Sequence, residues 1–273
     1  MIVDYHMHLR DPEDGPRGSY SADYAERFVA QARVAGVDEI GFTEHVFKFR
    51  ESMDLWEIEW MRERCTDALD DYVGAVTEAK ERGLPVKLGL EVDFFPGIER
   101  ALADLLEPYP WDYLLGSVHF VDGFAVDQEP GLVHRIPVGE AWRRYFVWLR
   151  DAARSGLFDC LSHPDLIKFF GMRATEEERH YLYVETADAI GAAGVCVEVS
   201  TAGLYKPVGE LYPDPALLAA FHERGVPITL ASDAHAPEHV GRDLDQAVAL
   251  AREAGYETVT VFDRRQRRQE PMG

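Results

Sequence analysis

Short apolar runs alternate with amphipathic segments along most of the chain. Runs with the length and composition of buried strands occur at residues 40–42, 86–90, 113–118, 158–161, 195–199, 227–231 and 258–262. Segments with a helical period lie between them, at residues 21–35, 55–81, 98–106, 138–155, 175–193, 215–223 and 244–254. Strands that alternate with helices predict a parallel sheet joined by right-handed crossovers.

The first ten residues predict a further strand, which carries polar groups on one face. Asp4, His6 and His8 alternate with apolar residues, and the side-chain period of a strand is 2, so these three side chains face the same way. A buried strand must satisfy such groups, because an unpaired buried polar group costs about 1–3 kcal/mol. A metal ion is a common partner for two neighbouring imidazoles. The alternative is that both histidines are exposed or hydrogen-bonded in the core.

The number of repeats predicts a closed barrel. Roughly seven β/α units occur in 273 residues, and no linker or low-complexity segment divides them. We therefore expect a single domain over residues 1–273 with an α/β barrel fold. In such barrels the side chains at the carboxyl ends of the strands converge on one mouth. The polar residues expected there are His6, His8, His45, Glu91, His119, His163, Asp233 and His235.

This constellation predicts a centre with more than one metal ion. Zinc takes about four ligands, and a catalytic site leaves one position open, so six histidines and two carboxylates imply two or three ions. Imidazole and carboxylate ligands suit Zn, Mn or Fe. Sites of this kind activate water and bind both sides of a phosphoryl group during hydrolysis. Taken singly, each residue could instead be a core histidine or an ion-paired acid, whereas eight at strand ends are hard to obtain by accident.

Charge and composition narrow the classes of partner. The chain has 28 Lys+Arg and 49 Asp+Glu, a formal charge of -21, which argues against nucleic acid as the main partner. The only basic cluster, Arg264 to Arg268, is interpreted as a solvated C-terminal end. Three cysteines without paired spacing, no signal peptide and no long apolar run favour a cytoplasmic protein with no membrane partner. Residues 120–137 are rich in Gly, Pro and Asp and are interpreted as a lid or substrate loop.

The ordered motifs resemble those of the PHP (polymerase and histidinol phosphatase) superfamily. They are Asp4-x-His6-x-His8, Thr43-Glu44-His45, Glu91, Ser117-Val118-His119, His163-Pro164-Asp165 and Ser232-Asp233-Ala234-His235. Several of them, with Thr201-Ala202-Gly203-Leu204, are similar to those of monofunctional histidinol-phosphate phosphatases. The resemblance covers nearly the whole chain and implies a distorted TIM-like (β/α)7 barrel with up to three metal ions.

The resemblance also implies a role for each matching residue. His6, His8, Glu91 and Asp233 would hold the first metal, and Glu91 would bridge to a second metal. His119 and His163 would hold that second ion, while His45 and His235 would hold a third. A hydroxide between the metals would attack phosphorus, so Glu91 and Asp233 are expected to be essential. His235 is a candidate proton donor, although a ligand would be unavailable for that role.

Two positions depart from the family pattern. The family has a further histidine in the loop after the first strand, where this chain has Asp14. A carboxylate there would make the third site harder and favour Mn or Fe over Zn. The family also has an arginine that contacts the substrate phosphate, where this chain has Tyr205 followed by Lys206. Lys206 or Lys168 is therefore expected to take the phosphate, although a lysine lacks the bidentate geometry of arginine.

The sequence thus predicts a metal-dependent phosphomonoesterase with a small phosphate ester as its substrate. L-Histidinol phosphate, an intermediate of histidine biosynthesis, is the expected substrate from the resemblance. One alternative keeps the chemistry and changes the substrate to another small phosphate ester or phosphotyrosine. Another is a non-catalytic metal-binding PHP module, although nearly every ligand position is filled. An amidohydrolase-like enzyme is disfavoured because the chain lacks the carboxylated-lysine pattern of that family. The oligomeric state is left open.

Overall fold

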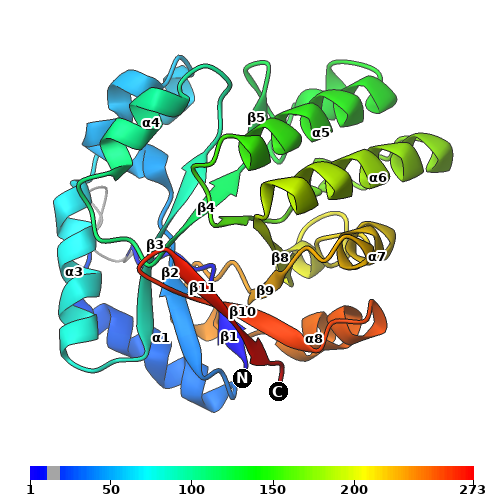
Figure 1. Ribbon diagram of the computed structural model, residues 1–273. Helices are drawn as coiled ribbons and strands as arrows, with labels where there is room; N and C mark the ends of the chain where they lie inside the picture. The colour runs from blue at the N-terminus through cyan, green and yellow to red at the C-terminus, as the bar shows by residue number, and fades with distance from the viewer. Residues whose placement is uncertain (11–18) are drawn as a thin grey trace.

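A computed structural model describes residues 1–10 and 19–273. Seven parallel strands form one sheet in the order β1-β2-β3-β4-β7-β8-β9 (Figure 1). Backbone hydrogen bonds from Tyr5 N to Leu230 O (3.0 Å) and from Ala234 N to His6 O (3.2 Å) join the two ends of this order, so the sheet is nearly closed into a barrel. The strands are β1 (Val3–Asp4), β2 (Glu39–Phe42), β3 (Val86–Asp93), β4 (Tyr113–Ser117), β7 (Cys160–Leu161), β8 (Cys196–Ser200) and β9 (Ile228–Ala231). The predicted α/β barrel is confirmed.

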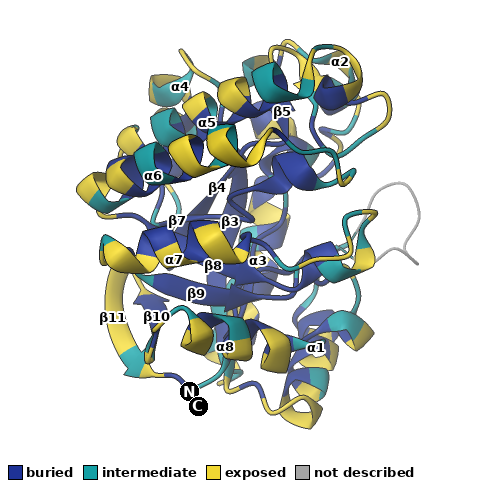
Figure 2. Ribbon diagram, turned by 90° about the vertical axis from the view of Figure 1, so that its right-hand side faces the viewer, coloured by how far each residue is buried: buried dark blue, intermediate teal, exposed yellow. Residues whose placement is uncertain are grey.

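In the described parts of the chain, seven helices surround the barrel, each with one exposed face and one buried face (Figure 2). Three of them begin at side-chain caps that the sequence supplies. Ser21 accepts a hydrogen bond from Tyr24 N, Asp214 accepts one from Ala216 N, and Thr175 forms a reciprocal capping box with Glu178. The helices are α1 (Ala22–Val34), α3 (Leu69–Glu81), α4 (Glu99–Leu106), α5 (Val138–Arg154), α6 (Glu176–Ala193), α7 (Pro215–Glu223) and α8 (Leu244–Glu253).

The predicted helix over residues 55–81 is wrong in its first half. That region contains the short helices η3 (Arg50–Leu55) and α2 (Glu59–Arg62), and a regular helix begins only with α3. The chain around Asp67 instead pairs with an earlier segment, because Arg50 N donates to Asp67 O and Asp67 N donates to Lys48 O, both at 2.9 Å. A continuous helix would forfeit these two backbone hydrogen bonds.

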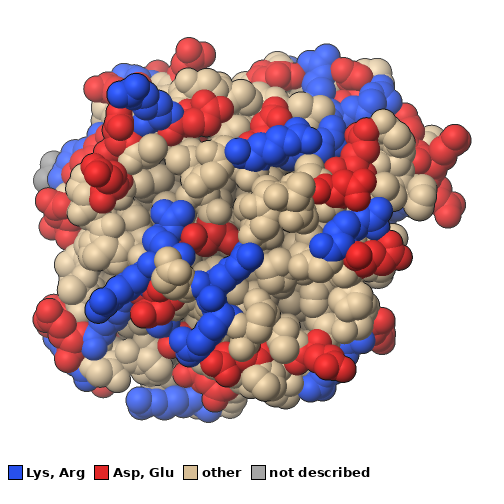
Figure 3. All heavy atoms as spheres, viewed as in Figure 1, with Lys and Arg blue, Asp and Glu red and all other residues tan. Residues whose placement is uncertain are grey.

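The basic C-terminal segment, Arg264 to Arg268, is exposed to solvent as expected, and it forms the turn and part of the second strand of a hairpin that was not predicted. β10 (Thr258–Asp263) pairs antiparallel with β11 (Gln266–Pro271), outside the barrel sheet. Arg265 donates to Leu157 O (2.7 Å) and Arg267 to Gly194 O, so both guanidinium groups lie at the carboxyl ends of α5 and α6. Cations are stabilised at the negative end of a helix dipole. Figure 3 shows Lys and Arg side chains gathered in the middle of this face.

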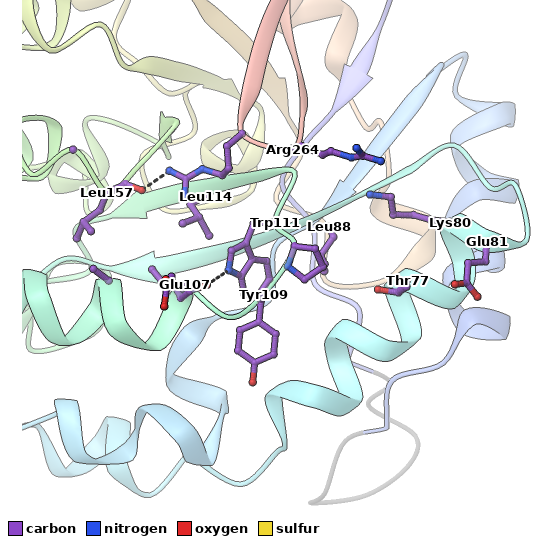
Figure 4. A pocket seen from close by; sticks show the side chains of 15 residues that line it. Thr77, Lys80, Glu81, Leu88, Glu107, Tyr109, Trp111, Leu114, Leu157 and Arg264 are labelled. Atoms are coloured by element: carbon purple, nitrogen blue, oxygen red, sulfur yellow. Dashed lines mark hydrogen bonds between the residues drawn. The ribbon is translucent and has the colours of Figure 1, made fainter.

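The hairpin closes the end of the barrel at which the strands begin. The Phe262 ring stacks on Tyr113 with 5.2 Å between centroids, and Tyr113 Oη donates to Tyr5 O at 2.6 Å. Glycine at position 41 makes room for this packing, since a Cβ there would lie 2.0 Å from Tyr113 Oη. A cavity of about 860 Å³ opens beside the hairpin turn, between α3 and α4 (Figure 4). It contains none of the predicted ligands.

The opposite end of the barrel carries short connections. The turns η2 (Val46–Lys48), η5 (Leu166–Lys168), η6 (Ala202–Tyr205) and η7 (Pro237–His239) follow β2, β7, β8 and β9. Residues 120–137, interpreted as a loop, contain the small hairpin β5 (Phe120–Val121) and β6 (Phe124–Ala125) and the turn η4 (Leu132–His134). The three cysteines are free and buried. Within residues 1–10 and 19–273, no helix has both the length and the apolar character needed to cross a membrane.

Candidate metal centre

The predicted histidines and carboxylates converge at the carboxyl ends of the strands. Their ligand atoms fall into four overlapping groups, and within each group they lie within 4.8 Å of one another. His6, His8, His45 and Glu91 each belong to two groups, so the groups form one continuous cluster. The groups are His8, His45 and His235; His6, His8 and Asp233; His6, Glu91 and His163; and His45, Glu91 and His119. All eight predicted residues of the described chain are therefore brought together.

Glu91 is at the centre of the cluster and presents each oxygen to a different set of imidazoles. Its Oε1 lies 3.3 Å from both His119 Nε2 and His163 Nε2. Its Oε2 lies 3.4 Å from His6 Nε2 and 2.6 Å from His45 Nδ1. The carboxylate is fully buried. This position suits a group that bridges two cations.

A second layer of carboxylates holds three of the imidazoles. Nδ1 of His6 is 3.0 Å from Glu198 Oε1, and Nδ1 of His119 is 2.8 Å from Asp93 Oδ1. Nδ1 of His8 likewise lies 3.3 Å from a carboxylate oxygen, Oε1 of Glu44. When Nδ1 carries the proton in each pair, Nε2 is left as an unprotonated ligand that faces the cluster.

The donor atoms fit divalent cations. His6 Nε2, His45 Nδ1 and Glu91 Oε2 are buried and make no hydrogen bond, although the last two atoms are only 2.6 Å apart. Buried polar atoms without partners cost about 1–3 kcal/mol each, and cations between them would remove this cost. Nitrogen and carboxylate donors without any thiolate match Zn, Mn or Fe rather than Cu(I).

The cluster strongly perturbs its own ionisation. Burial by itself would raise the pKa of Glu91, but the charges of His45 and His6 hold it well below its usual range. Burial opposes and neighbouring carboxylates favour the charged form of His8, whose pKa rises to about 9. Partial desolvation at the crowded mouth, with the charge of His8, lowers the pKa of His235 to about 3. Such opposed shifts are typical of functional sites.

Asp4 fixes the segment that carries Asp233. Its carboxylate accepts hydrogen bonds from Ser232 N (2.8 Å), Ser232 Oγ (2.5 Å) and Gly241 N (2.9 Å). Asp233 itself has a left-handed backbone with φ of 53°, which an aspartate tolerates better than most residues. Its Oδ1 reaches 3.2 Å from His8 Nε2 and 3.8 Å from His235 Nδ1. Asp4 therefore acts on the cluster through Asp233.

The residues predicted to bind the substrate differ in how far they are buried. The Lys168 side chain is fully buried, and its Nζ lies 2.9 Å from Asp165 Oδ2 and 2.7 Å from Leu211 O, so it would reach a phosphate only by breaking these contacts. Tyr205 is half-exposed and hydrogen-bonded to Asp243. Lys206 follows it and is partly buried. Asp14 lies outside the described residues.

The sequence interpretation missed the second-layer carboxylates and one arginine. Glu198 was detectable as a charged residue inside the apolar strand 195–199, and Asp93 as a second acid two positions after Glu91. The arginine is Arg242, whose guanidinium carbon lies 3.9 Å from the centre of the Tyr205 ring. Its Nε is buried without a hydrogen bond. No pattern in the sequence marks this stacking.

Comparison with known proteins agrees with the geometry. The family model for the PHP domain matches residues 18–202. The chain is 34% identical to a probable histidinol-phosphatase of Deinococcus radiodurans over 265 residues, covering 94% of this chain and 96% of that protein. It is 24% identical to a probable histidinol-phosphatase of Schizosaccharomyces pombe, covering 88% and 84% of the two chains.

A solved structure shows the same fold over nearly all of the chain. It is the histidinol phosphate phosphatase of Lactococcus lactis, in complex with zinc, L-histidinol and phosphate. The two structures superpose with a TM-score of 0.77 at 21% identity, over 98% of each chain. The extent of the family match, together with the close relative from Deinococcus, establishes that this protein belongs to the PHP domain family.

Proposed function

We propose that this protein is a metal-dependent phosphomonoesterase that hydrolyses L-histidinol phosphate to L-histidinol and phosphate. The observation that carries the proposal is the convergence of eight imidazole and carboxylate ligands at one barrel mouth. The relatives that align with nearly the whole chain bear the names of histidinol-phosphatases, which supports the choice of substrate.

The proposed ligand assignment follows the division of the Glu91 oxygens. His6, His8 and Asp233 would hold one cation together with Glu91, and His119 and His163, which face the other oxygen of Glu91, would hold a second. His45 and His235 would hold a third, with Asp14 as a further candidate ligand. His45 belongs both to the group with His235 and to the group with Glu91 and His119. Because these two groups share a ligand, we propose that the centre holds two or three ions of Zn, Mn or Fe.

The chain's own residues prepare this site for phosphate-ester hydrolysis. Bound divalent cations would supply Lewis acidity toward a phosphoryl oxygen and would acidify a water molecule. Glu198, Asp93 and Glu44 keep the imidazoles in the ligating tautomer and orientation. His235, half-exposed at the mouth, has a pKa lowered by burial and by the charge of His8, so its imidazole is neutral at neutral pH and is a better ligand than proton donor.

Two basic side chains at the mouth, those of Lys206 and Arg242, are proposed to contact the substrate phosphate. Lys206 follows the turn η6 directly and is partly buried. The guanidinium carbon of Arg242 lies 3.9 Å from the centre of the ring of Tyr205, which occupies the sequence position of the family arginine. Thr201 Oγ1 donates to Arg242 O at 2.9 Å, which anchors this backbone to the end of β8. Stacking leaves the edge of a guanidinium free for bidentate contact with phosphate.

The test is phosphate release from L-histidinol phosphate by protein loaded with Zn, Mn or Fe, before and after chelation. We expect turnover that is lost with a chelator and restored by metal. A panel with phosphotyrosine and other small phosphate esters ranks the substrates. Fully loaded protein that hydrolyses other esters but not L-histidinol phosphate would overturn the substrate assignment, and loaded protein that hydrolyses none would overturn the activity.

A further inference from the structure

Two polar atoms beside the metal centre are buried without a hydrogen-bond partner among the described residues. They are Tyr212 Oη and Asp127 Oδ1, and neither residue belongs to a metal-ligating group. The Tyr212 side chain is almost fully buried, with 1% of its surface exposed. An unsatisfied buried group costs about 1–3 kcal/mol, so a pair next to a reaction centre points to a ligand that satisfies them.

Tyr212 is held rigidly next to one metal-ligand candidate. Its backbone pairs with Ser200 at the end of β8, through Ser200 N to Tyr212 O (2.7 Å) and Tyr212 N to Ser200 O (2.9 Å). Its ring meets the imidazole of His163 edge-on, with 6.2 Å between centroids. Gly203 packs against it closely, since a Cβ there would lie 2.9 Å from Tyr212 Cε2. The hydroxyl is therefore fixed by backbone and packing.

Asp127 approaches the same place from the long connection after β4. It follows Val126, whose N–H donates to His119 O at 2.8 Å, and the His119 and His163 rings lie 5.1 Å apart. The backbone next to Asp127 is thus held at His119, and the ring of Tyr212 packs against the neighbouring imidazole, His163. Burial and then nearby acidic groups, Asp127 among them, raise the pKa of Tyr212 well above 10. The phenol is consequently neutral and can donate or accept a hydrogen bond.

Asp127 is the acid at this place without a charged partner. The neighbouring buried carboxylate, Asp165, is balanced by Lys168 at 2.9 Å, and the same ammonium lies 5.2 Å from the centre of the Tyr212 ring. Asp127 makes no ion pair within residues 1–10 and 19–273, whereas Asp122 of the same connection pairs with Arg144 at the surface. Asp127 is half-buried with its Oδ1 enclosed, and a charged N–H group of a ligand would satisfy that oxygen.

We propose that Asp127 and Tyr212 form a subsite for a positively charged nitrogen of the phosphate ester. This inference rests on the proposed phosphatase function and deepens it, because it states which esters the site selects: phosphate monoesters with an amine near the phosphate. The cationic N–H group donates to Asp127 Oδ1 and to Tyr212 Oη. The connection after β4 thereby contributes to substrate specificity.

The experiment compares L-histidinol phosphate with its des-amino analogue on the metal-loaded protein. Asp127→Asn and Tyr212→Phe each remove one interaction with little change in volume, and Asp122→Asn, in the hairpin just before Asp127, is the matched control. We expect the wild type and the control to prefer the amine-bearing ester. In Asp127→Asn the ratio of kcat/KM values for the two esters should fall about 10- to 100-fold, since a hydrogen bond to a charged group is worth about 1.5–3 kcal/mol. Tyr212→Phe should reduce it less.

A binding measurement separates this inference from the proposed activity. Calorimetry with L-histidinol, which has the cationic nitrogens but no phosphate, should show binding to the wild type that Asp127→Asn weakens about tenfold or more. If the protein binds L-histidinol in this way but hydrolyses no phosphate ester, the proposed activity is refuted while the subsite is supported. Equal losses on both esters, an unchanged ratio, or L-histidinol binding that is absent or insensitive to Asp127→Asn refutes the subsite, and ordered water then satisfies the two atoms.

Discussion

Replacing Glu198 by glutamine should switch off His6 as a metal ligand through its tautomer. Both Glu198 oxygens lie near His6 Nδ1, at 3.0 and 3.1 Å, and Oε2 also accepts a hydrogen bond from His163 N at 3.1 Å. The backbone N–H of His163 can only donate, so the carbonyl oxygen of the introduced glutamine must face it. The amide NH₂ then takes the place of Oε1, 3.0 Å from His6 Nδ1, while the carbonyl oxygen near the same nitrogen is already shared with His163 N. The NH₂ favours an acceptor at Nδ1, which moves the ring proton to Nε2.

The expected loss of metal affinity follows from the position of the ring proton, because a proton on Nε2 occupies the place of the metal. His6 Nε2 is the atom that lies 3.4 Å from Glu91 Oε2 and belongs to two of the four ligand groups. Keeping Nε2 unprotonated in the variant would leave Nδ1–H facing an amide N–H, an unsatisfied buried contact worth about 1–3 kcal/mol. Either outcome lowers metal affinity by roughly 10- to 100-fold, which is the usual cost of losing such an outer carboxylate.

Asp93→Asn provides the informative comparison. Only Asp93 Oδ1 contacts His119 Nδ1, while Oδ2 makes no hydrogen bond, so the asparagine carbonyl can keep the contact and its NH₂ can take the free position. We expect its loss of affinity to be clearly smaller than that of Glu198→Gln. Glu223→Gln, exposed on α7, controls for the loss of one charge.

The assay is competition between protein and a chromophoric chelator for Zn and Mn, with imidazole ¹⁵N shifts to report the tautomer of His6. Phosphate release measures the effect on turnover. Wild-type affinity and turnover in Glu198→Gln, or equal losses in Glu198→Gln and Asp93→Asn, would refute the tautomer argument. A changed melting temperature in the metal-free variant would attribute the loss to folding.

Three further predictions concern the centre, the mouth and the barrel. Glu91→Gln should lower the metal content and reduce turnover by on the order of a hundredfold or more, because one residue faces both halves of the cluster; elemental analysis and phosphate release test this. Arg242→Gln should raise KM about tenfold with a smaller change in kcat, and an unchanged KM would exclude the residue from phosphate binding. Gly41→Ala should lower the free energy of unfolding by about 1–3 kcal/mol through its clash with Tyr113, whereas the helical, exposed Gly74→Ala should raise it by about 0.5–1 kcal/mol in denaturant titrations.

The barrel could be predicted from the sequence because each of its strands is a short apolar run that ends in polar residues. The C-terminal hairpin could not, since β11 has almost no buried side chain and its arginines resemble a solvated segment. What holds that strand is pairing with β10 and the helix ends that Arg265 and Arg267 reach. Both are contacts between distant segments, which periodicity does not report. The break in residues 55–81 was missed for the same reason.

The inner ligands could be predicted because strand topology fixes where strand ends meet. The contacts between these ligands and the outer carboxylates could not be predicted. Whether Glu198 contacts His6 or another residue depends on which strands face each other across the barrel. Lys168 shows why the expected phosphate contacts are harder to predict. The expectation rests on its charge, whereas in the structure its ammonium contacts Asp165 Oδ2 and Leu211 O inside the protein. Charge alone does not distinguish a cation that binds substrate from one that balances a buried acid.

The acidity of the chain bears on which substrate the site can take. With 49 acidic and 28 basic residues, the overall field repels a phosphate ester, and the carboxylates around the centre add to this repulsion. Divalent cations reverse the sign locally, so attraction of the phosphate depends mainly on the metal centre and only secondarily on Lys206 and Arg242. Beside the centre, Asp127 adds a negative charge that has no ion-pair partner among the described residues. A substrate with a phosphate at one end and a cationic nitrogen at the other matches both signs, whereas an ester with no positive charge meets the acidic surroundings uncompensated.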